Sequence, residues 1–465
     1  MSTLTTSATR NATYTQEYLD IIDSLGGDET GRRAARDYME RSSAKYHNEV
    51  IYSSYLPKFF DKATFDRLSD IARLTYSILG KVMNEYLHNP TYRKIFDYDQ
   101  RLVDLILLPR NYDAILPFAR VDLFLNEDTL DVTFCEFNAD GSSGMNEIRE
   151  VEQSIESSKP YEIFAAQHTI NGCRNRMFEG WVDDFLRIYD SYEFKTAHPH
   201  VAIVDFLDYG ITDEFKAYQP LFEARDVEFS VFDMRQLEFD GTHLTGKHAF
   251  VGRDDTRIDA IWRRCVTNDV MDNWEASQAL IKAVRAGKVA LIGSFAGHIV
   301  HDKQIFKALM RPETTHLLTA EERDFIEATI PYTTFLDATH VDLATVKAQP
   351  QRWIIKPTDE YACQGVFAGP DYTISEWSRI IDQHANGASG RPYLVQQFCQ
   401  PFRTEALPFY GNEKDYTASP RMMNNLTGLY LCDGQLGGIY SRQGPEPIIL
   451  GEYGGLTPAT FWVDC

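Results

Sequence analysis

Residues 118–140 contain the feature that most constrains the fold, a predicted hairpin whose two strands both place polar side chains at even-numbered positions. Side chains alternate between the faces of a strand, so each strand turns its polar set to a single face. The two sets share one face if the connecting loop, around the turn-prone segment 126–128, has an odd number of residues. The polar side chains are Arg120, Asp122, Glu136, Asn138 and Asp140.

Two carboxylates and an amide on this face indicate a divalent-metal site. Asp122, Glu136 and Asn138 offer the hard oxygen ligands that magnesium prefers, usually together with phosphate oxygens. Arg120 cannot ligate a metal but could hold a phosphate beside one. The alternative is a solvated hairpin face with incidental ion pairs. Cys135 alternates to the opposite face, and we expect it in the core.

A turn rich in glycine and serine follows the second strand. Ser142 and Ser143 stand between Gly141 and Gly144, directly after Asp140. Backbone amides and hydroxyls in such a turn can donate hydrogen bonds to an anion. The two serines are therefore candidate substrate-binding residues.

Length and composition restrict the functional class. The 465 residues suffice for two or three domains around a large core. The 46 basic and 68 acidic side chains give a formal charge of −22, which disfavours nucleic-acid binding. Seven cysteines without paired spacing indicate reduced thiols, and no apolar run approaches the ~20 residues of a membrane span. We expect a cytoplasmic enzyme that does not bind membranes; the sequence does not indicate its oligomeric state.

The pattern of apolar residues changes along the chain and divides it into several regions. A helical repeat over 61–88 precedes the hairpin. Four short apolar runs between 195 and 295 alternate with helical stretches or loops, which predicts a small α/β domain with a mostly parallel sheet. A capping box at 319–322 and a turn at 433–434 predict a later helix and hairpin. The predicted regions are a disordered lead (1–12), a helical region with the first hairpin (13–194), the α/β domain (195–295) and a C-terminal part (296–465).

Two lysines in the C-terminal part are candidates for binding nucleotide phosphates. Lys356 lies at the end of the apolar strand 353–357, and Lys303 opens a helix. Each is either a surface charge or a point charge aimed at a phosphate. The loop 358–369, which contains Gly365, could fold over phosphates and close the site.

Two further segments could complete a nucleotide site. Gln396 and Gln397 end a buried-looking strand before Phe398, a position where amides could contact the edge of adenine. The alternative is an ordinary central strand leaving its sheet. Arg442 follows a later strand and is a candidate site residue only if the other candidate residues lie close to it.

Taken in order, these segments resemble the glutathionylspermidine synthase family of ATP-grasp ligases over roughly residues 100–465. The acids precede the lysines here, as in this circularly permuted family. The matching segments are Arg120-x-Asp122, Glu136-x-Asn138-x-Asp140 with its serines, 259–264, Asp302-Lys303, 331–333, Lys356-Pro357, Gln396-Gln397 and Arg442.

The resemblance implies an α/β (α+β) ATP-grasp fold with mixed sheets and a small pre-ATP-grasp-like α/β domain. It also implies a role for each candidate residue. Mg²⁺ would be held by Asp122, Glu136 and Asn138, the phosphates of ATP by Lys303, Lys356 and the Gly365 loop, adenine by Gln396, Gln397 and Phe398, and the transferring phosphoryl group by Arg120 and Arg442. The loop after Lys356 is bulkier than in the family, and no substrate specificity follows from these motifs.

The implied activity is an ATP-dependent ligation of a carboxylate to an amine. The carboxylate, on a small molecule or peptide, is first phosphorylated, and the amine then attacks to leave an amide, ADP and phosphate. Arg263 or Arg264 is a candidate for holding the carboxylate substrate. The alternatives are a kinase-like transferase with the same nucleotide site and an ATP-binding module without catalysis.

Overall fold

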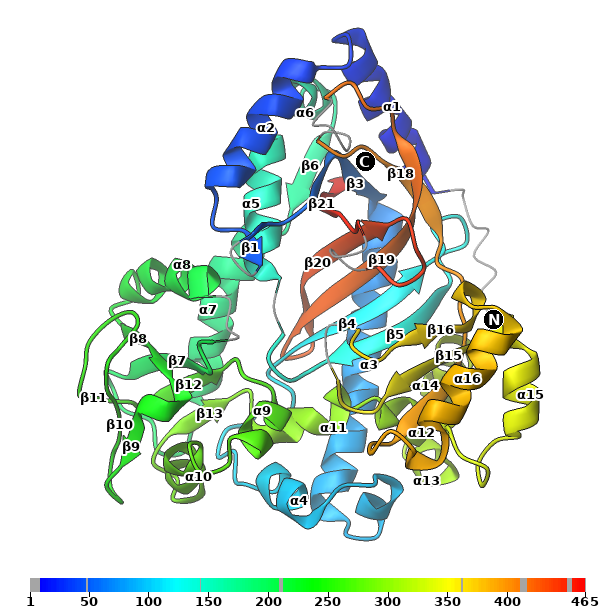
Figure 1. Cartoon of the computed structure of the whole chain (residues 1–465). Coiled ribbons are helices and arrows are strands. Elements are labelled where there is room, and N and C mark those ends of the chain that lie inside the picture. The colour runs from blue at the N-terminus through cyan, green and yellow to red at the C-terminus, as the bar shows by residue number, and fades with distance from the viewer. Residues whose placement is uncertain are drawn as a thin grey trace.

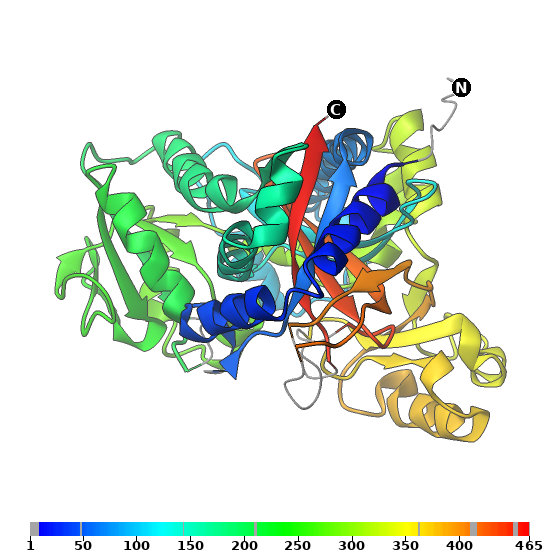
Figure 2. The same cartoon turned by 90° about the horizontal axis from the view of Figure 1, so that it is seen from above.

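The fold is described from a computed structural model, which covers residues 9–46, 49–142, 144–208, 212–360, 363–409, 416–449 and 454–464. Figures 1 and 2 show a central group of strands flanked on one side by a green parallel sheet and on the other by a yellow and orange antiparallel sheet. None of the helices in these ranges has the length and apolar character to cross a membrane.

The central sheet contains both predicted hairpins. Its strands are β4 (Phe118–Leu125), β5 (Val132–Asn138), β18 (Arg403–Ala406), β19 (Arg421–Cys432) and β20 (Gln435–Gly444). The order is β18-β19-β4-β5, with β20 paired to β19. The predicted turn between β19 and β20 is confirmed, because Asp433 and Gly434 both have the positive φ that a type I′ turn requires.

A β-bulge decides which side chains of the first hairpin share a face. The loop between β4 and β5 spans residues 126–131, an even number, so the condition of an odd loop is not met. The pairing is regular from the loop to Leu123, which pairs with Phe134. Asp122 then pairs with Glu136, so Cys135 is left as an extra residue. A regular ladder would turn Glu136 to the other face. Cys135 is half-buried at this bulge rather than in the core.

A second, mixed sheet joins the two ends of the chain. Its order is β3-β21-β6, with β3 (Ser53–Asp61) parallel to β21 (Thr457–Asp464) and β6 (Thr169–Gly172) antiparallel to it. The predicted helix over 61–88 is confirmed as α3 (Lys62–His88), which packs against β19 and β20. The other elements near this sheet are α1 (Asn11–Ser24), α2 (Glu29–Arg41), β1 (Lys45–Tyr46), β2 (Glu49–Val50), α5 (Met145–Glu156) and α6 (Lys159–Ala165).

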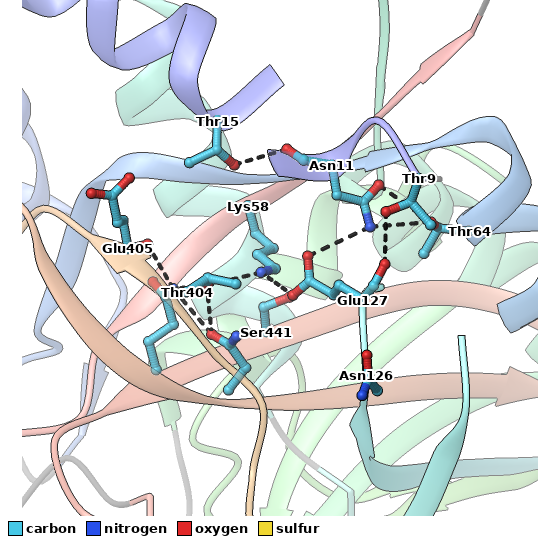
Figure 3. Close-up of polar contacts among 12 residues, drawn as sticks. Thr9, Asn11, Thr15, Lys58, Thr64, Asn126, Glu127, Thr404, Glu405 and Ser441 are labelled. Atoms are coloured by element: carbon cyan, nitrogen blue, oxygen red, sulfur yellow. Dashed lines mark hydrogen bonds and ion pairs between the residues drawn. The ribbon is translucent and has the colours of Figure 1, made fainter. Parts of the chain in front are cut away.

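A buried ion pair anchors the loop of the first hairpin to the second sheet (Figure 3). Glu127 in the loop pairs with Lys58 of β3, and only 6% and 5% of these residues are exposed. Thr9 donates a hydrogen bond to the carbonyl of Glu127 at 2.7 Å, and Lys58 donates to Thr404 of β18 at 3.0 Å. Buried charges need such added hydrogen bonds to offset their desolvation. The loop is therefore held directly by the segment around Thr9 and by β3, and β18 in turn holds Lys58.

The predicted parallel sheet is confirmed between residues 200 and 292. Its order is β13-β12-β7-β8, and every neighbouring pair is parallel. The elements here are α7 (Arg174–Asp190), β7 (His200–Asp205), α8 (Thr212–Glu223), β8 (Glu228–Asp233), β9 (Leu237–Phe239), β10 (Leu244–Gly246), β11 (Thr256–Arg257), β12 (Ala260–Arg263), α9 (Thr267–Asp272), α10 (Gln278–Arg285) and β13 (Ala290–Ile292). The carboxyl ends of β7 and β12 lie side by side where the strand order reverses.

An antiparallel sheet carries the second candidate lysine. Its order is β14-β17-β15-β16, formed by β14 (Thr333–Phe335), β15 (Trp353–Pro357), β16 (Phe367–Ala368) and β17 (Tyr393–Gln397). The predicted capping box of α14 is confirmed, because Thr319 and Glu322 accept hydrogen bonds from each other's backbone amides. The neighbouring helices are α11 (His298–His301), α12 (Gln304–Leu309), α13 (Pro312–Thr315), α14 (Ala320–Thr329), α15 (Leu343–Ala348) and α16 (Ile374–His384).

Short elements complete the described fold. They are α4 (Gln100–Ile106) and the 3-10 turns η1 (Tyr92–Ile95), η2 (Met234–Gln236), η3 (Phe295–Gly297), η4 (Pro350–Arg352), η5 (Gly369–Asp371) and η6 (Ala385–Gly387). The largest hydrophobic core packs α3 and α7 against strands of the central sheet. That packing buries one face of the sheet and leaves the other for polar side chains.

Candidate active site

Two rows of side chains cross the polar face of the central sheet. One row consists of Glu136, Asp122, Gly428 and Tyr440, and the next of Asn138, Arg120, Tyr430 and Gly438. The prediction of a shared polar face is confirmed for Arg120, Asp122, Glu136 and Asn138. It is wrong for Asp140, which lies beyond the end of β5 at Asn138 and pairs with Arg263. Gly428 leaves room for this arrangement, because a Cβ atom there would lie 2.8 Å from Oδ1 of Asp122.

Asp122 is held on both of its oxygens. Arg120 donates from Nε to Oδ1 at 2.7 Å and from Nη2 to Oδ2 at 2.9 Å, and Asn138 donates from Nδ2 to Oδ2 at 3.0 Å. Burial raises the pKa of Asp122 above its ordinary value, and the contact with Arg120 opposes that shift. The candidate metal ligand is thus paired with a neighbouring cation.

Glu136 is paired in the same way with Lys303. The Nζ atom of Lys303 lies 3.0 Å from Oε1 of Glu136 and also donates to the carbonyl of Glu360 at 2.6 Å. Burial alone would raise the pKa of Glu136, but the ammonium of Lys303 outweighs it and lowers that pKa to about 2. The side chain of Glu136 remains 27% exposed. Sequence positions 136 and 303 therefore meet in one site.

Lys356 reaches the same hairpin from the antiparallel sheet. Its Nζ atom donates to the carbonyl of Cys135 at 3.1 Å and to Oε1 of Gln396 at 2.9 Å. Gln396 in turn donates to the hydroxyl of Thr333 at 2.9 Å. Burial lowers the pKa of Lys356, because both of its hydrogen-bond acceptors are neutral. A buried ammonium held by neutral oxygens is suited to receive an anion.

Gln397 and Phe398, the other adenine candidates, lie next to Gln396 at the end of β17. Gln397 is exposed, and Phe398 is half-buried with its backbone amide donating to the carbonyl of Arg352 at 2.8 Å. The structure brings both next to Gln396, and their contact with adenine stays a prediction.

Arg442 lies on the polar face in a short chain of hydrogen bonds. Its Nε atom donates to the hydroxyl of Tyr440 at 2.6 Å, and that hydroxyl donates to Glu147 of α5 at 2.6 Å. The guanidinium of Arg120 lies 5.2 Å from the centre of the Tyr440 ring. Both candidate arginines therefore contact one tyrosine, which neither the spacing nor the composition of the sequence indicates.

The glycine- and serine-rich turn leads into α5 beside these arginines. Gly144, with φ of 99°, precedes the helix, and a Cβ atom there would lie 3.6 Å from Nη1 of Arg120. Ser142 donates to the carbonyl of Asn138 at 2.8 Å. Ser143 lies outside the described residues. The amino end of α5 thus opens next to Arg120, where a helix favours an anion.

Asp140 and the two arginines at the end of β12 form buried ion pairs away from the polar face. Asp140 pairs with Arg263, which also donates to the carbonyl of Gly293 at 3.0 Å. Burial by itself would raise the pKa of Asp140, but Arg263 holds it well below its ordinary value. Arg264 lies 2.7 Å from Glu214 of α8. Arg263 and Arg264 are each engaged with a carboxylate in the free protein, so binding a substrate there would require an exchange of partners.

The loop 358–369 is tied to both flanking units. The backbone amide of Lys303 donates to the carbonyl of Thr358 at 2.7 Å, and Asn268 of α9 donates to that of Asp359 at 3.0 Å. Gly365 has φ of 67° and Cys363 has φ of 54°. Residues 361 and 362 lie outside the described ranges. The loop lies over Lys303, as a cover for a phosphate would.

The donor set of the hairpin fits a magnesium ion shared with phosphates. Among the described residues, no group of three or more His, Cys, Asp and Glu side chains has the arrangement of a metal site. Asp122 and Glu136 are nevertheless direct cross-strand neighbours, and Asn138 adds an amide oxygen. Magnesium sites commonly use one or two carboxylates and complete the shell with phosphate oxygens and water.

Comparison with known proteins identifies the fold. No family model and no curated protein matches the sequence. A solved glutathione synthetase-like effector from Globodera pallida, in its apo form, aligns with a TM-score of 0.57 and 10% identity over 93% of this chain and 96% of that chain. This chain shares the fold of that protein. The predicted α/β fold class, with mixed sheets and a small α/β unit, is confirmed.

A second solved structure aligns more weakly. It is a putative gamma-glutamylcysteine synthetase from Methylobacillus flagellatus, with a TM-score of 0.39 and 11% identity over 83% of this chain and 84% of that chain. No argument rests on this alignment. The likeness to glutathionylspermidine synthases in particular stays a prediction.

Proposed function

We propose that the protein is an ATP-dependent ligase that joins a carboxylate to an amine, as glutathionylspermidine synthases do. One observation carries the proposal: Lys303 and Lys356, from two different elements, converge on the hairpin that presents Asp122 and Glu136. Carboxylates, lysines and arginine meeting on one sheet face provide what transfer of a phosphoryl group from ATP asks of a protein.

The reaction follows from the arrangement of charge. A carboxylate oxygen of the substrate attacks the γ-phosphorus of ATP, the bond to the ADP oxygen breaks, and an acyl phosphate forms. The amine then attacks the acyl carbon, phosphate leaves and the amine loses a proton. Arg120 and Arg442 lie beside the amino end of α5 and stabilise the negative charge of the transferring phosphoryl group. A cation stabilises such charge more strongly in a partly buried site than in water.

The nucleotide would lie between the antiparallel sheet and the hairpin. Lys303 and Lys356 contact its phosphates, the loop around Gly365 covers them, and the segment Gln396–Phe398 borders adenine. Asp122, Glu136 and Asn138 would hold Mg²⁺, which would offset the negative charge of the nucleotide phosphates when bound. Closure of the loop keeps water from the acyl phosphate.

The substrates are placed by weaker arguments. Ser142 and Ser143 would bind the carboxylate substrate next to α5, and Arg264 would do so only after leaving Glu214. We further propose a small-molecule or peptide carboxylate, a separate amine and a cytoplasmic location, the last because the cysteines lack paired spacing.

The test is a matrix of carboxylates and amines, including short peptides and polyamines, incubated with the protein, ATP and Mg²⁺. ADP release and the product mass are measured for each pair. A ligase sustains ADP release over many turnovers only with both substrates, and its product has the mass of the carboxylate plus the amine minus water. A stable phosphorylated acceptor that accumulates over many turnovers without any amine would identify the kinase-like transferase instead. Tight MgATP binding with no ADP from any pair would identify a binding module.

A further inference from the structure

The carboxylates and the cations of the site pair with one another. Each carboxylate proposed to bind metal already contacts a cation proposed to bind phosphate: Asp122 contacts Arg120 through two hydrogen bonds, and Glu136 lies 3.0 Å from Lys303. Asp122 and Lys303 are deeply buried, with 4% and 7% of their side chains exposed, whereas the side chain of Glu136 is 27% exposed. Water therefore cannot readily replace the partner of Asp122 or of Lys303.

Neither ligand alone can satisfy both partners of such a pair. A divalent metal that takes Glu136 leaves the ammonium of Lys303 buried without its carboxylate. A phosphate that takes Lys303 leaves the carboxylate of Glu136, with 27% of its side chain exposed, without its ammonium partner. Removing one partner of a buried ion pair is costly because the remaining charge is uncompensated. The two ligands together supply a new partner to each group.

We propose that this self-pairing makes metal and nucleotide binding strongly interdependent, with Glu136 acting as the residue that blocks the phosphate subsite until metal arrives. In turn, Lys303 blocks the metal subsite until a nucleotide phosphate arrives. This inference rests on the proposed function, because it assumes that a nucleotide phosphate and a metal share the site. It assigns Glu136 a second role, the exclusion of metal-free nucleotide, beyond that of a metal ligand.

Two other cations of the site, Lys356 from the antiparallel sheet and Arg442 on the polar face, are not restrained in this way. Within the described part of the chain, no ion pair joins Lys356 or Arg442 to a carboxylate; their contacts are the carbonyl of Cys135, Gln396 and the hydroxyl of Tyr440. They can receive a phosphate without leaving a carboxylate exposed. The specificity for the metal-loaded nucleotide therefore rests on the two pairs Glu136–Lys303 and Asp122–Arg120.

The test measures binding by calorimetry, with ATP in EDTA and with ATP in excess MgCl₂. Glu136→Gln removes the competing charge and keeps the side-chain shape. We expect this variant to bind metal-free ATP about tenfold more tightly than the natural protein and to bind MgATP less tightly. The ratio of the dissociation constant for metal-free ATP to that for MgATP therefore decreases. A residue that serves only as a metal ligand would leave metal-free ATP binding unchanged.

A double-mutant cycle separates this effect from a general change of charge. In a Lys303→Gln background, the additional change Glu136→Gln should no longer tighten metal-free ATP, because the lysine that it releases is absent. The same gain in both backgrounds would overturn the proposal. Reciprocity requires that Lys303→Gln tighten Mn²⁺ binding in the absence of nucleotide, as measured by electron paramagnetic resonance.

The outcomes distinguish the two levels of the account. If the natural protein binds neither ATP nor MgATP, the proposed function fails and the inference fails with it. If MgATP binds but Glu136→Gln leaves metal-free ATP binding unchanged or weaker, only the self-pairing inference is overturned. Circular dichroism and thermal melting of each variant establish that the comparison is made between folded proteins.

Discussion

The Nζ atom of Lys356 donates a hydrogen bond to the main-chain carbonyl of Cys135, the extra residue of the β-bulge in the first hairpin. The bulge therefore has two consequences. It turns Glu136 to the same face as Asp122, and it presents an unpaired carbonyl to a lysine from another sheet. Bulges near active sites commonly redirect a side chain in this way.

Deletion of Cys135 tests the second consequence alone. The shortened strand forms a regular ladder in which Glu136 still opposes Asp122, but the carbonyl that positions Lys356 is lost. We expect MgATP binding to persist. Turnover should fall by about tenfold, which corresponds to an increase of about 1.4 kcal/mol in the activation free energy when Lys356 is misplaced. Cys135→Ala is the matched control, because it keeps the carbonyl and should retain full turnover. Equal turnover of the deletion variant and the control would show that the bulge only spaces the strand.

Gly428 should tolerate no side chain beneath the candidate metal ligands. A Cβ atom there would lie 2.8 Å from Oδ1 of Asp122 and 3.0 Å from Cδ of Arg120. We expect Gly428→Ala to lower kcat/KM by at least about tenfold, because the carboxylate must move. Gly80→Ala is the control: its Cβ atom meets only Ile115 at 3.6 Å in a helix, where alanine should stabilise the fold by about 0.5–1 kcal/mol. An unaffected kcat/KM in Gly428→Ala would contradict the geometry of the polar face.

Glu152 should make stability fall as pH rises. Burial raises the pKa of this fully buried carboxyl to about 8, although it accepts hydrogen bonds from the amides of Cys173 and Arg174 at 2.9 and 3.0 Å. The folded protein then retains a proton that the unfolded chain loses above its ordinary pKa of about 4.3. The free energy of unfolding should decrease by up to about 1.4 kcal/mol per pH unit from about pH 5 to pH 8 and level off above.

Chemical denaturation of the natural protein and of Glu152→Gln checks this dependence. The amide cannot ionise, so the difference in unfolding free energy between the two proteins should change steadily across this interval. A difference that stays constant between pH 5 and pH 8 would mean that Glu152 is ionised in the folded protein.

Cys363 occupies a strained backbone position over the site. Its φ of 54° lies in the left-handed region, which β-branched residues rarely adopt. We expect Cys363→Val to lower the unfolding free energy by about 1–2 kcal/mol and Cys363→Gly to cost little. Cys399→Val, at a half-buried position outside that region, should change stability less. The measurement is the denaturation midpoint of each variant; equal loss in both valine variants would argue against strain at Cys363.

Local pattern in the sequence was sufficient to predict several elements. Residues 61–88 and the turn at Asp433-Gly434 follow from periodicity and from a two-residue turn signal, because both depend on neighbours in the chain. The shared face of Asp122 and Glu136 was also predicted, although for the wrong reason. The even loop needed a bulge at Cys135, and a single extra residue in a ladder is fixed by tertiary contacts rather than by local preference.

The unpredicted parts of the site depend on contacts between distant segments. Tyr440 and Glu147, which join Arg442 to α5, lie 293 positions apart. The ion pair of Arg264 with Glu214 likewise depends on how α8 packs beside β12. Gly428 did carry a signal, since glycine inside a strand often marks a close approach, but only the neighbouring strand reveals what approaches it.

The central claim is that Glu136 and its neighbours support ATP-dependent ligation, and the most direct test is ADP release by Glu136→Ala beside the natural protein. Once a productive carboxylate and amine are known, both proteins are assayed with ATP and Mg²⁺, and Asp70→Asn on the exposed side of α3 serves as a charge control. The account predicts at least a hundredfold loss of ADP formation in Glu136→Ala, with an unchanged far-ultraviolet spectrum and full activity in Asp70→Asn. Undiminished ADP formation by Glu136→Ala would contradict it.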